Sequence, residues 1–144
     1  MANVPVEPGV YLLGVHIGFR TVLTPAPHSV DEGIPVFAQP EQVPPLRQAI
    51  IIQPATGPTS YFLSLFLKPQ IKLAYANELV FAREGSPVPW TFDPSVQGLN
   101  IISDKGLAVR AEFPGAQLRL AEQEDVPQDT WSLHRLHLPI PPGA

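Results

Sequence analysis

The sequence predicts an all-β domain built from three related units of short strands, and three observations support this prediction. Nineteen of the 144 residues are proline, spread along the chain, and a proline inside a helix costs about 3 kcal/mol. The segments between the prolines are rich in Val, Ile, Leu, Phe and Tyr and alternate in part between apolar and polar residues, as half-buried strands do. The third observation is an internal repeat of about 40 residues, a period typical of repeated structural units.

The repeat is clearest in the strand that closes each unit. Ile50, Trp90 and Trp131 lie 40 and 41 residues apart, and a large apolar residue follows two positions after each of them, on the same face of a strand. The preceding strands align through the segments PVFA, LVFA and LRLA. Three units of four strands predict a β-trefoil, in which six strands close a barrel and six form a hairpin cap. A different barrel or a sandwich is the alternative.

The first unit is expected over residues 9–55. It opens on the apolar run VYLLGV, a Gly-Phe turn leads into the second strand, and a proline-containing loop precedes each of the last two strands, as turn chemistry favours. The strands are expected at Gly9–Ile17, Arg20–Thr24, Pro35–Gln39 and Gln48–Gln53.

The second and third units are expected over residues 56–95 and 96–138, with 139–144 as a tail. They open on YFLSLF and LNIIS, and turn signals separate nearly all of the strands. The strands are expected at Tyr61–Leu67, Ile71–Ala76, Leu79–Arg83, Trp90–Phe92, Leu99–Ser103, Leu107–Glu112, Gln117–Glu122 and Thr130–Leu136. All three units are assigned to one domain, 1–144, because a chain of this length forms a single core.

Composition excludes several classes of function. The net charge is −4 and no cluster of Lys and Arg is present to neutralise phosphates, which argues against a nucleic-acid partner. The chain has no cysteine, so disulfides and thiolate chemistry are excluded. No apolar run approaches the ~20 residues of a membrane span. The opening MANVPVEPGV lacks the pattern of a signal peptide, so a cytoplasmic location is expected, with unconventional export as the open alternative.

Catalytic and metal-binding patterns are weak. His134 and His137 would lie on opposite faces of a strand, whereas zinc needs three or four converging ligands. His28, Ser29 and Asp31 have the residue types of a catalytic triad, but they share one irregular loop and no strained G-x-S-x-G turn is present. No glycine loop for phosphate occurs. The sequence therefore predicts a protein that is not an enzyme and holds no metal or cofactor.

A binding protein is the better expectation, because a rigid barrel can position variable loops and proline-rich loops lose less entropy when they bind. The opening EPGVYLLGVHI, the terminal DTWSLHRL, the chain length and the absence of cysteine resemble the small β-trefoil protease inhibitors of mushrooms. The nearest group is the cospin-like serine protease inhibitors, and the mycocypin cysteine protease inhibitors are more distant. The resemblance implies inhibition of proteases, most of all serine proteases, through a surface loop, in fungal defence or in control of the fungus's own proteolysis.

The resemblance also indicates which loops to consider. In the cospin-like group it points to the loop between the second and third strands, here Pro25–Gly33, which offers no Lys or Arg for a trypsin-like pocket. In the mycocypins it points to two loops; the first is only Gly18-Phe19 here, whereas the second, Pro40–Arg47, is long enough to act. Two further basic residues lie in other loops. The candidate inhibitory residues are Pro27, His28, Ser29, Val30, Asp31, Leu46, Arg47, Lys68 and Arg83. For each of them the alternative is an ordinary solvated loop residue.

Carbohydrate binding is the alternative function, with glycans as the partners, because β-trefoils also serve as lectins. The Q-x-W motif of ricin-type lectins is absent: VPW and DTW stand at two of the positions and Ile50 at the third. Tyr11, Tyr61 and Tyr75 offer rings that could stack on sugars, but two of them begin expected strands and are better explained as core or rim residues.

Overall fold

The structure is a computed structural model that describes residues 3–85 and 87–142. Over these residues it contains twelve β-strands and two short 3-10 helices. The strands are β1 (Gly9–His16), β2 (Arg20–Pro25), β3 (Ile34–Gln39), β4 (Ile50–Pro54), β5 (Tyr61–Leu65), β6 (Lys72–Ala76), β7 (Leu79–Arg83), β8 (Thr91–Pro94), β9 (Leu99–Ile102), β10 (Ala108–Arg110), β11 (Arg119–Ala121) and β12 (Trp131–Leu136). The helices are η1 (Leu46–Gln48) and η2 (Pro127–Asp129). Every expected strand is present, which confirms the all-β prediction.

Six strands form a closed ring. β1 pairs with both β4 and β12, β4 pairs with β5, and β8 pairs with β9. The two remaining contacts are single bridges, Tyr61 with Trp90 and Leu99 with Trp131. We call β1–β4, β5–β8 and β9–β12 the first, second and third units. In each unit the first strand therefore meets the fourth, and the fourth strand meets the first strand of the next unit.

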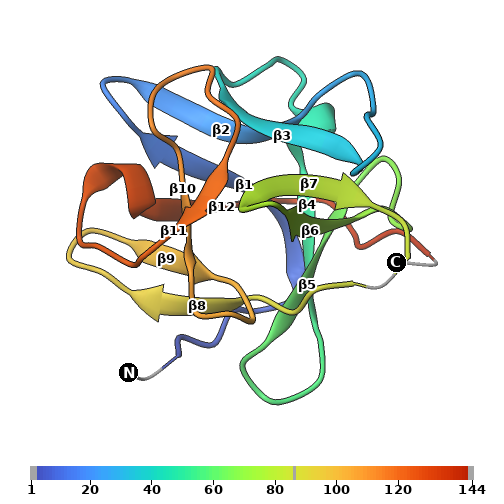
Figure 1. Ribbon diagram of the computed structural model, residues 1–144. Helices are drawn as coiled ribbons and strands as arrows, with labels where there is room; N and C mark the ends of the chain where they lie inside the picture. The colour runs from blue at the N-terminus through green and yellow to red at the C-terminus, as the bar shows by residue number, and fades with distance from the viewer. Residues whose placement is uncertain (1–2, 86, 143–144) are drawn as a thin grey trace.

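The other six strands form three hairpins, β2–β3, β6–β7 and β10–β11. Figure 1 shows the hairpins arranged around one axis, with β3, β7 and β11 on the inside. β7 pairs with β3 and β11, and a bridge between Phe37 and Gln117 joins the first hairpin to the third. The hairpins consequently cover one end of the ring, as the predicted cap requires.

The strand register places the three aligned positions at the same point of the ring. Ile50 lies opposite Tyr11, Trp90 opposite Tyr61 and Trp131 opposite Leu99. Ile50 and both tryptophans are fully buried in the main core cluster. A buried tryptophan removes about 150–250 Å² from water, which contributes about 4–6 kcal/mol of hydrophobic free energy.

The two tryptophans also make the same polar contact. The indole nitrogen of Trp90 donates to the carbonyl oxygen of Leu73 at 3.3 Å, and that of Trp131 donates to the carbonyl oxygen of Val109 at 3.0 Å. Leu73 and Val109 are both the second residue of the second strand of their unit. The tryptophans are thus structural, since a buried indole N–H needs a partner.

The third strands of the first two units correspond as predicted, but the third strand of the third unit, β11, is shifted by one residue relative to them. Ala38 lies opposite Leu23 and Ala82 lies opposite Leu73, but in the third unit it is Leu120, and not Ala121, that lies opposite Val109. The alignment of LRLA with PVFA and LVFA is therefore wrong by one position. The similarity of three short apolar segments was too weak to determine the register.

Candidate functional site

Three loop clusters lie at equivalent places around the cap. Each consists of the loop between the second and third strands of a unit, the loop between its third and fourth strands, and the first turn of the next unit. Two of the clusters enclose a hollow. The three clusters differ in the side chains that occupy equivalent positions.

The first hollow has a volume of about 340 Å³ and lies between the β2–β3 loop, η1 and the β5–β6 turn. It brings together five of the nine candidate residues, Pro27, His28, Ser29, Arg47 and Lys68. Leu46 is the neighbour of Arg47 in η1, and Val30 and Asp31 form the exposed end of the β2–β3 loop. Arg83 lies apart, at the end of β7.

Hydrogen bonds at both ends hold the β2–β3 loop. At its base the N–H of Ala26 donates to the carbonyl of Pro35 at 2.8 Å, and near its tip Val30 and Gly33 exchange backbone hydrogen bonds of 2.8 and 3.0 Å. Gly33 has φ of 132°, and a Cβ there would lie 2.8 Å from the carbonyl oxygen of Ala82. Only glycine fits this position, because the left-handed conformation and the close backbone both oppose a side chain.

The β3–β4 loop is held from inside by Gln48, whose side chain is fully buried. Its oxygen accepts the N–H of Gln42 at 2.8 Å, and its amide nitrogen donates to the hydroxyl of Thr24 and to the carbonyl of Pro40, both at 2.9 Å. Both amide protons and the oxygen are therefore engaged. Val43 stands at the exposed end of this loop, 94% accessible, before the cis Val43–Pro44 bond.

Two of the three basic candidates, Arg47 and Arg83, contact neighbouring loops or strands. Arg47 donates to the carbonyl of Pro25 at 2.9 Å and to the side-chain oxygen of Gln42 at 3.3 Å, so it joins the β2–β3 and β3–β4 loops. Arg83 is half-buried and its guanidinium lies 3.5 Å from the carbonyl oxygens of Glu32 and Tyr75. These contacts place both guanidinium groups against the protein surface.

Lys68 is exposed, but its backbone is turned. Its N–H donates to the carbonyl of Leu65 at 3.2 Å, and its own carbonyl accepts the N–H of Ile71 at 2.9 Å. These two bonds confine Lys68 to the short turn between β5 and β6, whereas Val43 stands at the end of the longer β3–β4 loop.

The sequence analysis does not single out Val43. Its only sequence signal is a lone apolar residue before two prolines, in a segment with no strand pattern.

The second hollow is larger, about 750 Å³, and occupies the equivalent place between the third and first units. It lies between the β10–β11 loop at Glu112–Pro114, the β11–β12 loop at Asp125–Gln128 and the β1–β2 turn at His16–Gly18. Val96 and Gln97 from the β8–β9 turn complete its rim, and Trp131 lines its floor.

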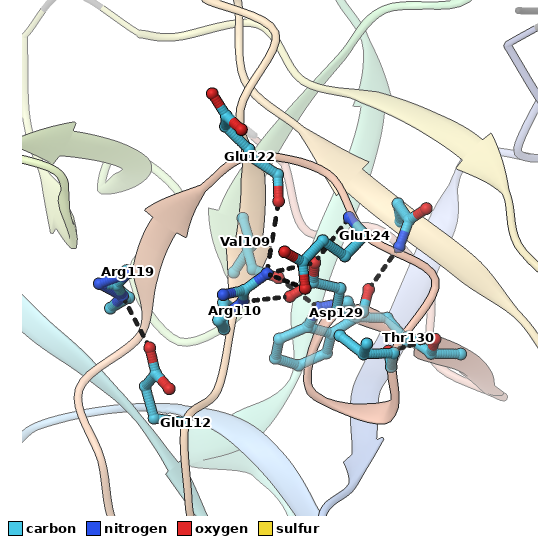
Figure 2. A network of polar contacts seen from close by, with 11 residues as sticks. Val109, Arg110, Glu112, Arg119, Glu122, Glu124, Asp129 and Thr130 are labelled. Atoms are coloured by element: carbon cyan, nitrogen blue, oxygen red, sulfur yellow. Dashed lines mark hydrogen bonds and ion pairs between the residues drawn. The ribbon is translucent and has the colours of Figure 1, made fainter.

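An ion pair holds the β11–β12 loop beside this hollow (Figure 2). Asp129 is fully buried and accepts from Arg110 at 2.7 and 3.1 Å, through both carboxylate oxygens. One of these oxygens also accepts the N–H of Glu124 at 3.1 Å, and Asn100 donates to the backbone carbonyl of Asp129 at 2.7 Å. The hydrogen bond to Asp129 is the main cause that raises the pKa of Arg110.

The third cluster contains a tyrosine at the corresponding point. Tyr75 follows Leu73 by two residues, as Pro25 follows Leu23 and Ala111 follows Val109, and only Tyr75 is large. Its hydroxyl donates to Asp104 at 2.5 Å, and the ammonium of Lys105 lies 5.6 Å from its ring centre. Burial and the hydrogen bond to Asp104 raise the pKa of Tyr75 to about 12.

The described residues, 3–85 and 87–142, hold no group of three His, Asp or Glu side chains placed to bind a metal ion. None of the helices in this part of the chain is long and apolar enough to span a membrane. Tyr11 and Tyr61, two of the rings considered for sugar stacking, are buried in the core.

Comparison with known proteins identifies the fold. No family model and no curated sequence matches the chain. The designed three-fold symmetric protein ThreeFoil superimposes with a TM-score of 0.75 and 18% identity, over 89% of this chain and 99% of that one. The Rhizoctonia solani agglutinin gives 0.74 and 13% identity, over 94% and 100%.

Two further structures agree. The Polyporus squamosus lectin, solved with a human-type influenza-binding epitope, gives a TM-score of 0.77 and 14% identity over 92% of this chain and 51% of that one. A β-trefoil named BEL gives 0.69 and 15% identity over 93% and 97%. Identities this low establish the architecture alone. The ring, the cap and these similarities together show that the chain is a β-trefoil, as its three-unit sequence pattern predicts.

Proposed function

We propose that this β-trefoil is a protease inhibitor that presents its β3–β4 loop, with the β2–β3 loop beside it, to a serine protease. The carrying observation is the buried amide of Gln48, which holds the β3–β4 loop from within through three hydrogen bonds. An inhibitory loop must keep its shape in the free protein, because ordering it on binding reduces affinity. We also propose that inhibition of foreign proteases by this loop serves in defence.

The exposed residues favour a target with an aliphatic primary pocket. Arg47 and Arg83 make contacts to the fold, and Lys68 lies in a turn. Val43 is 94% accessible at the end of the braced loop, and Val30 is 46% accessible at the end of the neighbouring one. We therefore expect elastase-like or subtilisin-like enzymes to be inhibited, and trypsin weakly or not at all.

The test is an inhibition panel of trypsin, chymotrypsin, elastase, subtilisin, papain and legumain with the full chain. Val43→Asp should weaken inhibition at least tenfold, because an aliphatic pocket excludes a carboxylate. Val96→Asp is the matched control, since Val96 is 79% accessible in the β8–β9 turn and lies outside both proposed loops. Inactivity of the wild-type protein against all six enzymes would refute the proposal.

A second candidate function is carbohydrate binding, which the second hollow favours. Phe113 is 62% accessible there, beside the amides of Gln97 and Gln128 and the carboxylate of Asp125. The two functions use different loops, so a single molecule has room for both.

A further inference from the structure

We infer that the second hollow is a binding site for a neutral saccharide, with Phe113 as the surface on which one sugar ring stacks. The inference rests on carbohydrate binding as the second candidate function and is independent of protease inhibition. It names the ligand class and the residues of the site.

Phe113 is exposed, and hydrogen bonds hold the backbone on either side of it. Its carbonyl accepts the N–H of Ala116 at 3.0 Å, and the preceding Ala111 is buried and donates its N–H to the carbonyl of Gln128 at 3.0 Å. A hydrogen-bonded loop therefore presents a phenyl ring to solvent, and the ring belongs to neither core cluster. A pyranose has an apolar face of C–H groups, and this face packs on an aromatic ring with loss of little conformational entropy.

The rim supplies the hydrogen-bonding groups that sugar hydroxyls need. Gln97, Gln128 and Ser132 offer both donors and acceptors. The carboxylate of Asp125 accepts the N–H of Val96 at 3.2 Å, which directs it at the β8–β9 turn on the rim. A few directed polar groups around an apolar surface are what a specific small-ligand site requires.

The charges favour a neutral ligand. Among the residues that line this hollow are Glu112 and Asp125, and neither Lys nor Arg belongs to the lining. Arg119 lies 3.0 Å from the carboxylate of Glu112 and offsets its charge, so an anionic sugar would meet the carboxylate of Asp125 with no Lys or Arg in the lining to balance it. A cationic ligand gains little, because a single carboxylate at an open rim attracts a cation only weakly.

The site is preformed and large enough for more than one sugar ring. Its volume of about 750 Å³ lies within the ~300–1,000 Å³ range of ligand pockets. The Arg110–Asp129 pair holds the β11–β12 wall, and Trp131, a fully buried residue of the core, belongs to the lining. The first hollow differs, since Arg47 and Lys68 line it, and in the third cluster the large side chain of Tyr75 stands at the corresponding point.

The experiment uses the full chain on an array of neutral glycans, among them lactose, N-acetyllactosamine, chitotriose and mannosides, together with their sialylated counterparts. The strongest neutral glycan is then titrated calorimetrically. We expect it to bind, its sialylated form to bind at least tenfold more weakly, and Phe113→Ala to reduce affinity at least tenfold. Phe113→Tyr keeps the ring and should retain binding.

The control separates this site from the inhibitory loops. Val43→Asp should leave glycan affinity unchanged, and Phe113→Ala should leave protease inhibition unchanged. The inference is overturned if no neutral glycan binds at millimolar concentration, if Phe113→Ala binds as well as the wild type, or if an oligolysine peptide occupies the hollow in preference to sugars. A protein that binds glycans but inhibits no protease would refute only the inhibitor proposal.

Discussion

Gln48 and Asp129 occupy the same position in two units of the β-trefoil, two residues before Ile50 and Trp131. Each is fully buried and accepts the N–H of a residue in its own loop, Gln42 for Gln48 and Glu124 for Asp129. Each also bonds a side chain of the second strand of its unit. Gln48 donates to the hydroxyl of Thr24, and Asp129 forms an ion pair with Arg110.

The second unit contains Val88 and Ala74 at the corresponding points, both packed in or against the core. Its loop between β7 and β8 includes no 3-10 helix among the described residues. A buried polar group thus accompanies each long loop of this kind that ends in a 3-10 helix, because such a loop leaves backbone groups that require partners.

Replacement of Gln48 by Leu should destabilise the protein by about 1–3 kcal/mol, because the Thr24 hydroxyl and the Pro40 carbonyl lose their partner. Protease inhibition should fall with it, as the loop loses its internal support, while glycan affinity stays constant. Urea unfolding followed by circular dichroism measures the first effect. Gln97→Leu, at an exposed amide, should change the free energy of unfolding by no more than ~0.5 kcal/mol.

Removal of one partner of the buried ion pair should be more costly. Asp129→Ala leaves the largely covered guanidinium of Arg110 with only the exposed carboxylate of Glu124, at 3.4 Å, and broken buried pairs cost about 3–5 kcal/mol. The double variant Arg110→Ala/Asp129→Val copies the apolar residues of the second unit and should recover part of that loss. Equal destabilisation by the single and double variants would show that the charges are not coupled.

Trp131→Phe and Trp90→Phe should each reduce the free energy of unfolding by about 2–4 kcal/mol. Each change leaves space in the core and removes the hydrogen bond to Val109 or Leu73. Differential scanning calorimetry measures both losses. Ile50→Val, at the equivalent position without a donor, should cost only about 0.5–1.5 kcal/mol, and a similar cost for all three variants would argue against the indole hydrogen bonds.

Tyr75 should make stability depend on alkaline pH. Its folded-state pKa is raised to about 12, above the ordinary value near 10, so the folded state favours the protonated phenol. The resulting stabilisation is complete below pH ~10 and is lost as the pH rises through about 12. Unfolding at pH 8 and pH 12 should show a smaller pH effect for Tyr75→Phe than for the wild type, and identical pH effects would contradict the assignment.

The fold could be predicted from the sequence because its signals are local. Proline marks the loops, alternation marks the strands, and the interval between Ile50, Trp90 and Trp131 marks the repeat. The register of β11 was harder to predict. This strand has only a few apolar residues in common with β3 and β7, and its position depends on its pairing with β10 and β7. A strand of three residues is too short for its sequence to indicate such long-range pairing.

The candidate site was predictable only in part. Pro27, His28, Ser29, Arg47 and Lys68 do meet around one hollow, but sequence alone does not tell a projecting arginine from one that donates to Pro25. Phe113 was not predicted as a site residue, because an isolated aromatic residue in a largely apolar chain is typical of the hydrophobic core. Its exposure follows from the path of the β10–β11 loop, which only the assembled cap determines.

The positions of the two tryptophans give the molecule its own pair of optical reporters. Trp131 lines the floor of the second hollow, whereas Trp90 packs edge-on against Tyr75 at a ring distance of 6.3 Å in the third cluster. The two tryptophans therefore lie at different loop clusters, and neither lines the first hollow. The emission of each tryptophan, isolated by changing the other to Phe, would distinguish a ligand on one side of the cap from a disturbance on another without any attached dye.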